Sequence, residues 1–254
     1  MHKDLTPQQA AQAKEYHYPY HHLFSYDHSG ENFSSFRAFN FSISYGIAVR
    51  LISQLLEDRK PNTLCDIGCG DGKLLAVLSE AYPDIQMTGY DYDEHSISWA
   101  KMFTPRINFE VRDISSSLLE PEFDFITLIE VIEHIPPRDV EDFIDYASMG
   151  LKQGGALVIT VPHKNQRTPA KHYQHFDSEQ LKSCIEASGN LEVIDVFGFH
   201  KRTVCEIISK GVLQTKNMFI ERPMFNKFRL KRQMSAIPVD ENKAQRLIAV
   251  SKKL

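Results

Sequence analysis

The chain has 254 residues, a formal net charge of −4 and 42% hydrophobic residues. These values suit one large globular domain, or a domain with a cap, and give no overall sign of a polyanion-binding protein. No apolar run approaches a membrane span, the start Met-His-Lys-Asp is unlike a secretory signal, and the four cysteines suit a reducing compartment, so we expect a cytoplasmic protein without membrane contact.

The first unusual segment precedes any predicted strand. Ten aromatic residues fall between Tyr16 and Tyr45, although aromatic residues make up 11% of the chain, and four histidines are interleaved with them. This segment is therefore not expected to belong to the core sheet. Its rings either pack an N-terminal helix onto the body or exclude water from a pocket, and both can hold at once.

A glycine-rich turn then joins a predicted strand to a predicted helix. The apolar run 63–67 ends at Gly68, Gly70 and Gly72, and a helical pattern begins at once over 73–78. Glycine has no Cβ and tolerates positive φ, so a ligand can approach the backbone N–H groups of such a turn. A purely structural strand-to-helix turn is the alternative.

The spacing and charge of this turn narrow the class of ligand. In the dinucleotide fingerprint, Gly-x-Gly-x-x-Gly, the third glycine comes one residue later than here. The turn also carries Asp66 and Asp71. An acidic turn suits a ligand with a cationic or zwitterionic part better than it suits a pyrophosphate.

Further strands follow, and acids stand at their ends. The segment 86–91 ends in Asp91, at a position where an acid can accept both ribose hydroxyls of a nucleoside. Asp93 and Glu94 suit the start of a helix over 95–101. A third strand, 107–111, leads to Asp113. Taken alone, Asp113 can be an ordinary aspartate in a turn.

The fourth predicted strand, 123–129, is nearly all apolar, as expected for a central parallel strand covered on both faces. It ends in Glu-Val-Ile-Glu-His, residues 130–134. A helix over 140–149 and a Lys-Gln-Gly-Gly turn precede the fifth strand, 156–161. The remaining strands are predicted over 191–197 and 246–251.

Taken in this order, the motifs of residues 45–200 resemble the class I methyltransferases that use S-adenosylmethionine. The resemblance implies an α/β, Rossmann-like fold with a seven-stranded, mostly parallel sheet flanked by helices. It implies S-adenosylmethionine as the cofactor, with Asp66 near the methionine ammonium, Asp91 on the ribose and Asp113 on the adenine amino group. The full cofactor-binding set that it implies is Asp66, Gly68, Gly70, Asp91, Tyr92, Asp113, Ile114 and Glu130.

The resemblance also suggests how the chain is divided. Residues 1–45 are expected to form an aromatic-rich lid, and residues 46–254 the cofactor-binding domain, with a basic substrate-side insertion at 201–235. Between Lys201 and Arg232 lie nine Lys or Arg and two acids, a local excess of +7. A solvated helix face is one interpretation, and a surface for an anionic nucleotide sugar, glycan or RNA is the other.

Histidines after the strands are the candidate catalytic groups. Methyl transfer needs an oriented acceptor and, for a hydroxyl, a base, and histidine is the natural base near neutral pH. His134 follows the fourth strand and His163 the fifth, so these two are the preferred candidates. His172 and His175 come later in the same loop. The Glu-Val-Ile-Glu-His string recurs in methyltransferases of different specificity, so His134 also has a pocket-shaping interpretation.

We expect no metal, but one alternative set of ligands stands out. Glu130, Glu133 and His134 fall at i, i+3 and i+4, and His175 follows later, which makes two carboxylates and two histidines. The arrangement is similar to the small-RNA 3′-end 2′-O-methyltransferases, in which such a set holds a metal. The residues that follow, Phe176-Asp177-Ser178-Glu179, depart from that family, and Asp177 or Ser178 suits the cap of a helix over 179–187.

These observations favour methyl transfer from S-adenosylmethionine to a small-molecule or glycan-type acceptor, a hydroxyl in preference to an amine, with a histidine base. The alternative is a metal-dependent RNA 3′-terminal 2′-O-methyltransferase. A degenerate fold that serves as a partner subunit is a third hypothesis, which the intact Asp66, Asp91 and Asp113 oppose. The sequence specifies neither the acceptor nor the oligomeric state.

Overall fold

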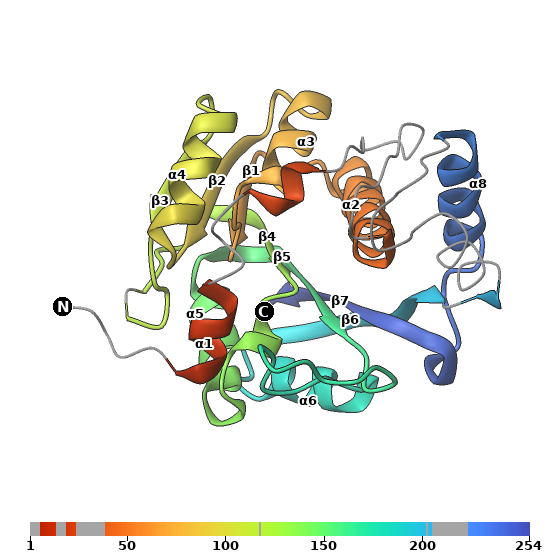
Figure 1. Cartoon of the computed structure of the whole chain (residues 1–254). Helices are drawn as coiled ribbons and strands as arrows, with labels where there is room; N and C mark the ends of the chain where they lie inside the picture. Colours follow the sequence, from red (N-terminus) through yellow and green to blue (C-terminus); the bar gives the residue numbers. More distant parts are fainter. Residues whose placement is uncertain (1–5, 14–18, 24–38, 117, 202, 205–222) are drawn as a thin grey trace.

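A computed structural model describes residues 6–13, 19–23, 39–116, 118–201, 203–204 and 223–254. In this part of the chain one sheet has the order β3-β2-β1-β4-β5-β7-β6 (Figure 1). The strand β7 runs antiparallel to β5 and β6, and the other pairs are parallel. The predicted seven-stranded, mostly parallel sheet is confirmed. The strands are β1 (Thr63–Ile67), β2 (Gln86–Asp91), β3 (Asn108–Val111), β4 (Phe123–Ile129), β5 (Leu151–Pro162), β6 (Leu191–Lys201) and β7 (Ala244–Lys253).

Helices cover both faces of the sheet (Figure 1). Side chains of β4 alternate between two cores: Phe125 belongs to the core beneath α2, α3, α4 and α8, and Ile126 to the core beneath α5 and α6. A strand with apolar residues on both faces is what a covered parallel sheet requires. The α-helices are α1 (Pro7–Ala13), α2 (Phe39–Arg59), α3 (Lys73–Ala81), α4 (Glu94–Phe103), α5 (Val140–Met149), α6 (Ser178–Glu186) and α8 (Pro223–Met234). Short 3₁₀ helices are η2 (Tyr20–Leu23), η3 (Ile132–His134), η4 (Pro137–Asp139) and η5 (Glu241–Lys243).

Two helix starts agree with the sequence analysis. Asp93 caps α4 by accepting a hydrogen bond from Ser96 N, and Asp177 caps α6 by accepting one from Gln180 N. The strand β5 is longer than expected, because the predicted turn at 151–155 continues the strand. Gly154, with φ 76°, provides the irregular backbone within it.

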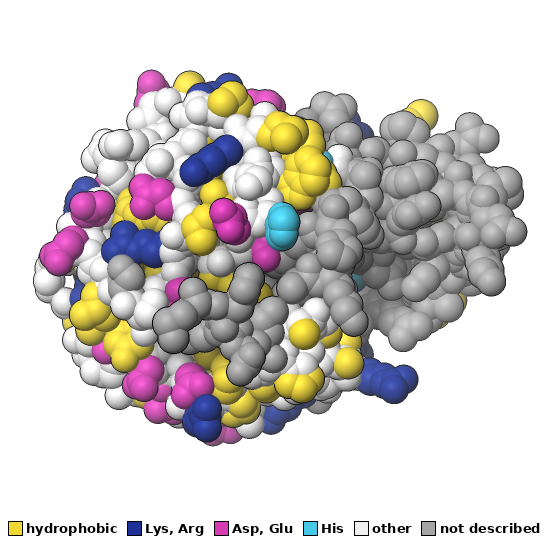
Figure 2. Space-filling model, turned by 60° about the vertical axis from the view of Figure 1, so that its left-hand side comes forward, with side chains coloured by type: hydrophobic (Ala, Val, Ile, Leu, Met, Phe, Trp, Pro, Cys, Tyr) yellow, Lys and Arg dark blue, Asp and Glu magenta, His cyan; other side chains and the backbone are white. Residues whose placement is uncertain are grey.

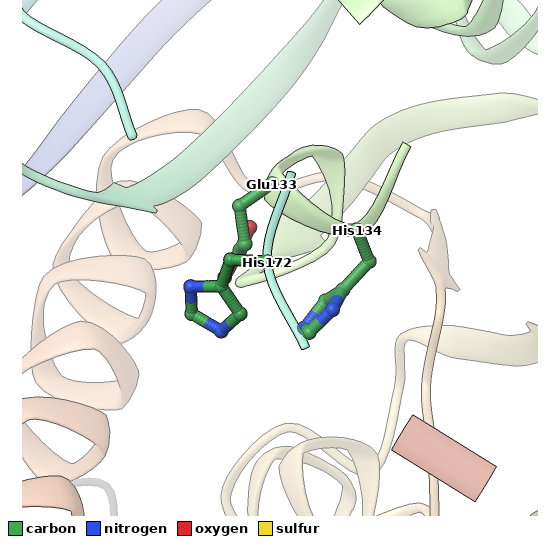
Figure 3. Close-up of side chains that lie close together, drawn as sticks. All are labelled: Glu133, His134 and His172. Carbon is green, nitrogen blue, oxygen red and sulfur yellow. The ribbon is translucent and has the colours of Figure 1, made fainter. Parts of the chain in front are cut away.

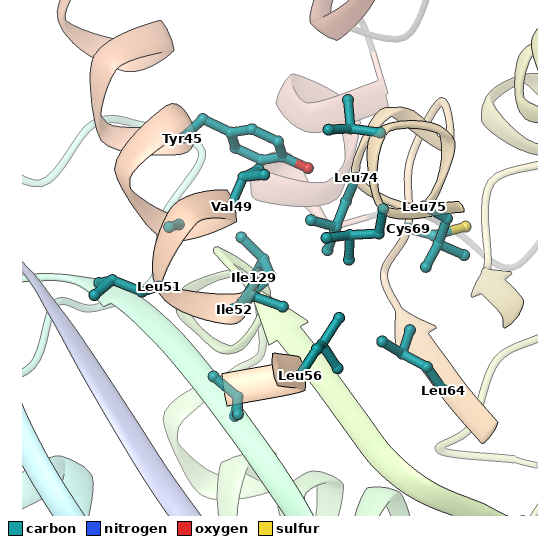
Figure 4. Close-up of a cluster of buried hydrophobic side chains, with 14 of the residues drawn as sticks. Tyr45, Val49, Leu51, Ile52, Leu56, Leu64, Cys69, Leu74, Leu75 and Ile129 are labelled. Atoms are coloured by element: carbon teal, nitrogen blue, oxygen red, sulfur yellow. The ribbon is translucent and has the colours of Figure 1, made fainter. Parts of the chain in front are cut away.

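The helix α2 runs through the domain boundary predicted at residue 45. Ile43 and Ile52 on this helix are fully buried, and Figure 4 shows Tyr45, Val49 and Ile52 facing the side chains of α3 and β1. Residues on both sides of the boundary therefore belong to one hydrophobic core. Most of the predicted lid precedes α2 and lies outside the described residues.

The predicted basic insertion is described only at its two ends. Residues 205–222 lie outside the described part, and α8 packs against α2 and β6. On the face in Figure 2, acidic and basic side chains are interspersed over the described surface. None of the helices in the described segments is long and apolar enough to span a bilayer.

Candidate functional site

The carboxyl ends of β1, β2 and β4 meet around the glycine-rich turn. Gly68, Gly70 and Gly72 all have positive φ, at 75°, 53° and 76°. A Cβ on Gly68 would lie 2.6 Å from Val131 Cγ2, so the turn packs directly against the segment after β4. The turn is fixed to β2 as well, because Gly68 N and Cys69 N both donate to Tyr90 O.

Asp91 joins the turn to the end of β2. Its carboxylate accepts hydrogen bonds from Gly70 N at 2.8 Å and from Asp93 N at 2.9 Å. Burial raises the pKa of Asp91 to about 6, and these two N–H groups oppose the shift. Tyr92, directly after it, is 45% exposed, so an aromatic ring stands at the rim beside this carboxylate.

Asp66 lies beneath the turn, on β1. It is 2% exposed and accepts a hydrogen bond from Thr127 Oγ1 at 2.7 Å. Burial raises the pKa of Asp66 to about 7, against the lowering effect of that bond. A buried carboxyl group with this pKa is stabilised in its ionised form when a cation approaches, as the predicted role beside an ammonium requires.

Asp71, the second acid of the turn, contacts the N-terminal segment. Its Oδ2 accepts a hydrogen bond from His21 N, and its Oδ1 lies 3.0 Å from His21 Nδ1. The sequence argument that both acids of the turn suit a cationic ligand is therefore corrected for Asp71, because a histidine of the same chain already engages its carboxylate.

The remaining predicted cofactor residues differ in their surroundings. After β3, Asp113 accepts a hydrogen bond from Ser115 N, and Ile114 is 2% exposed. Glu130, at the end of β4, has φ 57° and its Oε2 lies 2.7 Å from Arg246 Nε on β7. Burial raises the pKa of Glu130 and the Arg246 charge opposes it. Glu130 is thus held by an internal ion pair.

Glu133, His134 and His172 form a cluster beyond β4. One ligand atom from each lies within 4.8 Å of the others, and Figure 3 shows Glu133 and His134 on η3 with His172 on the segment alongside. Glu133 is fully buried, and neither carboxylate oxygen accepts a hydrogen bond from another described residue. Burial, followed by the charge of Glu130, raises the pKa of Glu133 well above its usual range.

Hydrogen bonds to carbonyl oxygens fix the proton positions in this cluster. A carbonyl only accepts, so the ring nitrogen facing it donates. His134 Nδ1 lies 3.0 Å from Lys171 O, which leaves the lone pair of the neutral ring on Nε2. His175 Nδ1 faces Gln166 O, and its Nε2 lies 2.9 Å from His172 Nδ1.

The same reasoning assigns the proton positions of His175 and His172. His175 donates to Gln166 O and accepts from His172, so the lone pair of His172 is also on Nε2. Burial lowers the pKa of His172 to about 2 and lowers that of His175, so both rings are neutral at ordinary pH. The cluster therefore contains two imidazole lone pairs and a buried carboxyl group.

His163, the other predicted base, lies apart from this cluster. It is 4% exposed, its Nδ1 accepts a hydrogen bond from Asn165 N at 3.0 Å, and its Nε2 faces Glu241 at 3.4 Å. Both ring nitrogens are thus engaged by neighbouring groups. The role of His163 as a base remains a prediction that this geometry does not favour.

The structure also rearranges the alternative metal set of Glu130, Glu133, His134 and His175. It brings Glu133 and His134 together with His172, while Glu130 contacts Arg246 and His175 lies behind His172. Arg246 was not named from the sequence, and His172 was named only as a less favoured candidate base and not as a metal ligand. The presence of His172 in the same loop as His175 was the available signal, but only the fold shows which ring faces Glu133.

Comparison with known proteins decides the family. A family profile described as a methyltransferase domain matches residues 42–195. The chain belongs to this methyltransferase family, within the class that uses S-adenosylmethionine. The matched region begins within α2 and ends within β6.

Named relatives of this methyltransferase act on different acceptors. Demethylspheroidene O-methyltransferase of Rhodobacter capsulatus is 29% identical over 107 residues, 42% of this chain and 27% of that protein. Small RNA 2′-O-methyltransferase of Mus musculus is 32% identical over 130 residues, 45% of this chain and 32% of that protein. The match thus spans about a third or less of these two relatives.

A solved structure shows the same fold. The SAM-dependent methyltransferase from Archaeoglobus fulgidus superposes with a TM-score of 0.58 at 18% identity, covering 84% of this chain and 95% of that one. The donor set of the methyltransferase domain fits S-adenosylmethionine. Buried acids lie at the carboxyl ends of β1 and β2, which are parallel neighbours, and can accept hydrogen bonds from the ammonium and ribose groups of this cofactor.

Proposed function

We propose that the protein transfers a methyl group from S-adenosylmethionine to a hydroxyl of a small-molecule or glycan-type acceptor, with His134 as the general base. When bound, the cofactor supplies a methyl group on a positively charged sulfur. Asp66 would hold its methionine ammonium and Asp91 its ribose hydroxyls. The names of both curated relatives above specify methylation of oxygen, which supports a hydroxyl acceptor.

One observation carries the choice of base. The Nδ1 of His134 donates to Lys171 O, so its Nε2 is the basic nitrogen, and it lies just beyond the carboxyl end of β4. Ligands in open α/β sheets bind beyond these strand ends. As the acceptor oxygen bonds to the methyl carbon, its proton passes to His134 Nε2, and the carbon–sulfur electron pair stays on sulfur.

The test is methyl transfer from radiolabelled cofactor to a panel of phenols, nucleotide sugars, glycans and RNA 3′ ends. The matched variants are His134→Asn, which keeps a donor toward Lys171 O but has no basic nitrogen, and His163→Asn. We expect label on at least one hydroxyl acceptor and its loss in the His134 variant only. Failure of the wild-type protein to bind S-adenosylhomocysteine would contradict the whole proposal.

A second candidate function rests on Glu133. Its buried carboxylate has no hydrogen bond from another described residue, and His134 and His172 each place a ring nitrogen within 4.8 Å of it, which is a donor set suited to a divalent cation. His175 would then orient His172 from behind. A cation here would hold vicinal hydroxyls, as a metal-dependent RNA 3′-terminal 2′-O-methyltransferase requires. The mouse relative adds support.

The two candidate functions require the same lone pair, that of His134 Nε2. His134 Nε2 cannot both bind a cation and accept a proton. The separating measurement is metal content by mass spectrometry, with EDTA inhibition and RNA 3′-end methylation measured on the same preparation. One metal ion per protein chain, lost in Glu133→Gln, would favour the metal-dependent RNA methyltransferase. Methyl transfer by a metal-free protein would favour His134 as the general base.

A further inference from the structure

The N-terminal segment contacts the glycine-rich turn at Asp71. Asp71 stands between Gly70 and Gly72, two residues with positive φ. His21 donates to its carboxylate twice, from the backbone N–H to Oδ2 and from Nδ1 to Oδ1, each at 3.0 Å. His22 Nε2 lies 3.0 Å from Asp71 O and, facing a carbonyl, donates to it.

These bonds matter because the turn is rich in glycine. Glycine loses more conformational freedom than other residues when it is fixed, so the conformation of residues 68–72 depends on contacts made from outside. Asp71 is 1% exposed, and a carboxylate this buried is costly without donors. Burial alone would raise its pKa, but the neighbouring His21 holds the pKa below its usual value.

The same two histidines also contact helices α2 and α4. The ring of His21 stacks on Tyr45 of α2, with 5.1 Å between centroids. The ring of His22 stacks on Phe103 of α4 at 4.2 Å. Burial lowers the pKa of His22, so this ring is neutral. Residues 20–23 therefore bridge α2, the turn and α4, the helix that follows Asp91.

A second contact lies on the acceptor side. Thr6 Oγ1 and Tyr173 OH are 2.6 Å apart, and Tyr173 N donates to Glu133 O. The N-terminal residues thus contact both the turn and the loop that carries His172.

We propose that His21 is a positioning residue for cofactor binding. Through Asp71 it holds the turn in its binding conformation, and so docking of residues 20–23 and binding of the cofactor stabilise each other. Such coupling is reciprocal, because two events that favour one conformation strengthen each other equally. The inference rests on the proposed function, since it takes the turn to bind S-adenosylmethionine.

The test compares His21→Ala with His21→Asn in the full chain. Asparagine retains an N–H donor near the position of Nδ1, and alanine does not. The exposed His95→Ala on α4 is the control. Calorimetry with S-adenosylhomocysteine should give affinity about tenfold weaker for the alanine variant and recovery of most of it for asparagine. At saturating cofactor, kcat should fall less than the affinity does.

Hydrogen exchange distinguishes a positioning role of His21 from a purely structural one. In the wild type, S-adenosylhomocysteine should slow amide exchange in residues 20–23, where His21 N–H is bonded to Asp71. In His21→Ala, which keeps this backbone N–H but loses the bond from Nδ1 to Asp71, the ligand should slow exchange much less. Two results together would overturn the proposal. Folded His21→Ala would bind S-adenosylhomocysteine with the affinity of the wild type, and the ligand would leave amide exchange in residues 20–23 of the wild type unchanged. No binding by the wild type would remove the proposed function and this inference together.

Discussion

Arg246 Nε lies 2.7 Å from Glu130 Oε2, although 116 residues separate them in the chain. The antiparallel strand β7 makes this contact, because Arg246 is paired with Pro162 at the end of β5. Their side chains are 14% and 17% exposed. Arg246→Met should cost about 3–5 kcal/mol of unfolding free energy, because it leaves a buried carboxylate without its cation. The measurement is urea denaturation.

The double variant Arg246→Met/Glu130→Gln is the control for this pair. It removes both charges, so it should recover most of the lost stability. Equal instability of the single and double variants would show that Arg246 acts through packing and not through its charge.

His134→Asn should lower kcat by about 10²–10⁴ while leaving the affinity for S-adenosylhomocysteine unchanged, because the variant loses a proton acceptor and no cofactor contact. The measurement is steady-state kinetics on the acceptor found in the screen. A parallel loss in His163→Asn would contradict the assignment, since both ring nitrogens of His163 are engaged elsewhere.

Asp66 should make folding stability depend on pH. An unfolded aspartate titrates near pH ~3.9, whereas Asp66 in the folded state titrates near 7. Between these values the folded protein holds a proton that the unfolded chain has released. Wild-type stability should therefore fall with rising pH across this window, by roughly 2–4 kcal/mol relative to Asp66→Asn.

Ligand binding should also be coupled to the protonation of Asp66. An ammonium beside Asp66 favours the carboxylate, so binding of S-adenosylhomocysteine near pH 6 should release protons. Calorimetry in two buffers of different ionisation enthalpy measures this release. The same release in Asp66→Asn would assign the proton to another group, such as Asp91.

Gly68→Ala should destabilise the fold by about 2–4 kcal/mol, because its φ of 75° and a contact of 2.6 Å with Val131 Cγ2 both oppose a Cβ. Thermal melting checks the effect. Val131→Ala in the same chain should recover only part of it, since it relieves the contact and leaves the backbone strain. Complete recovery would mean that the positive φ costs little here.

Local signals predicted most of the fold. The caps at Asp93 and Asp177 depend on residues three positions apart, and the strands β1 and β4 depend on short apolar runs, so a single sequence reveals them. The extension of β5 through Gly154 depends on its neighbours in the sheet. It therefore could not be read from a Lys-Gln-Gly-Gly string that ordinarily predicts a turn.

The sequence predicted the acidic groups of the candidate site but not the residues that reach it from distant parts of the chain. The acids at the ends of β1 and β2 follow from strand order, whereas Arg246 and the ring of His172 reach the site through long-range contacts. His172 lies beside Glu133, whereas both ring nitrogens of His175 are bonded to other groups, Gln166 O and His172 Nδ1. That distinction exists only in three dimensions.

The continuity of α2 has a practical consequence for dissecting the protein. Cutting before residue 46 would remove the first two turns of a 21-residue helix, including the buried Ile43 and Ser44. The new end would expose apolar surface on the core, and both rings of the His21–Tyr45 stack would be lost. The smallest fragment expected to fold therefore begins ahead of Phe39, and aggregation of a shorter one would report a damaged core and not a missing lid.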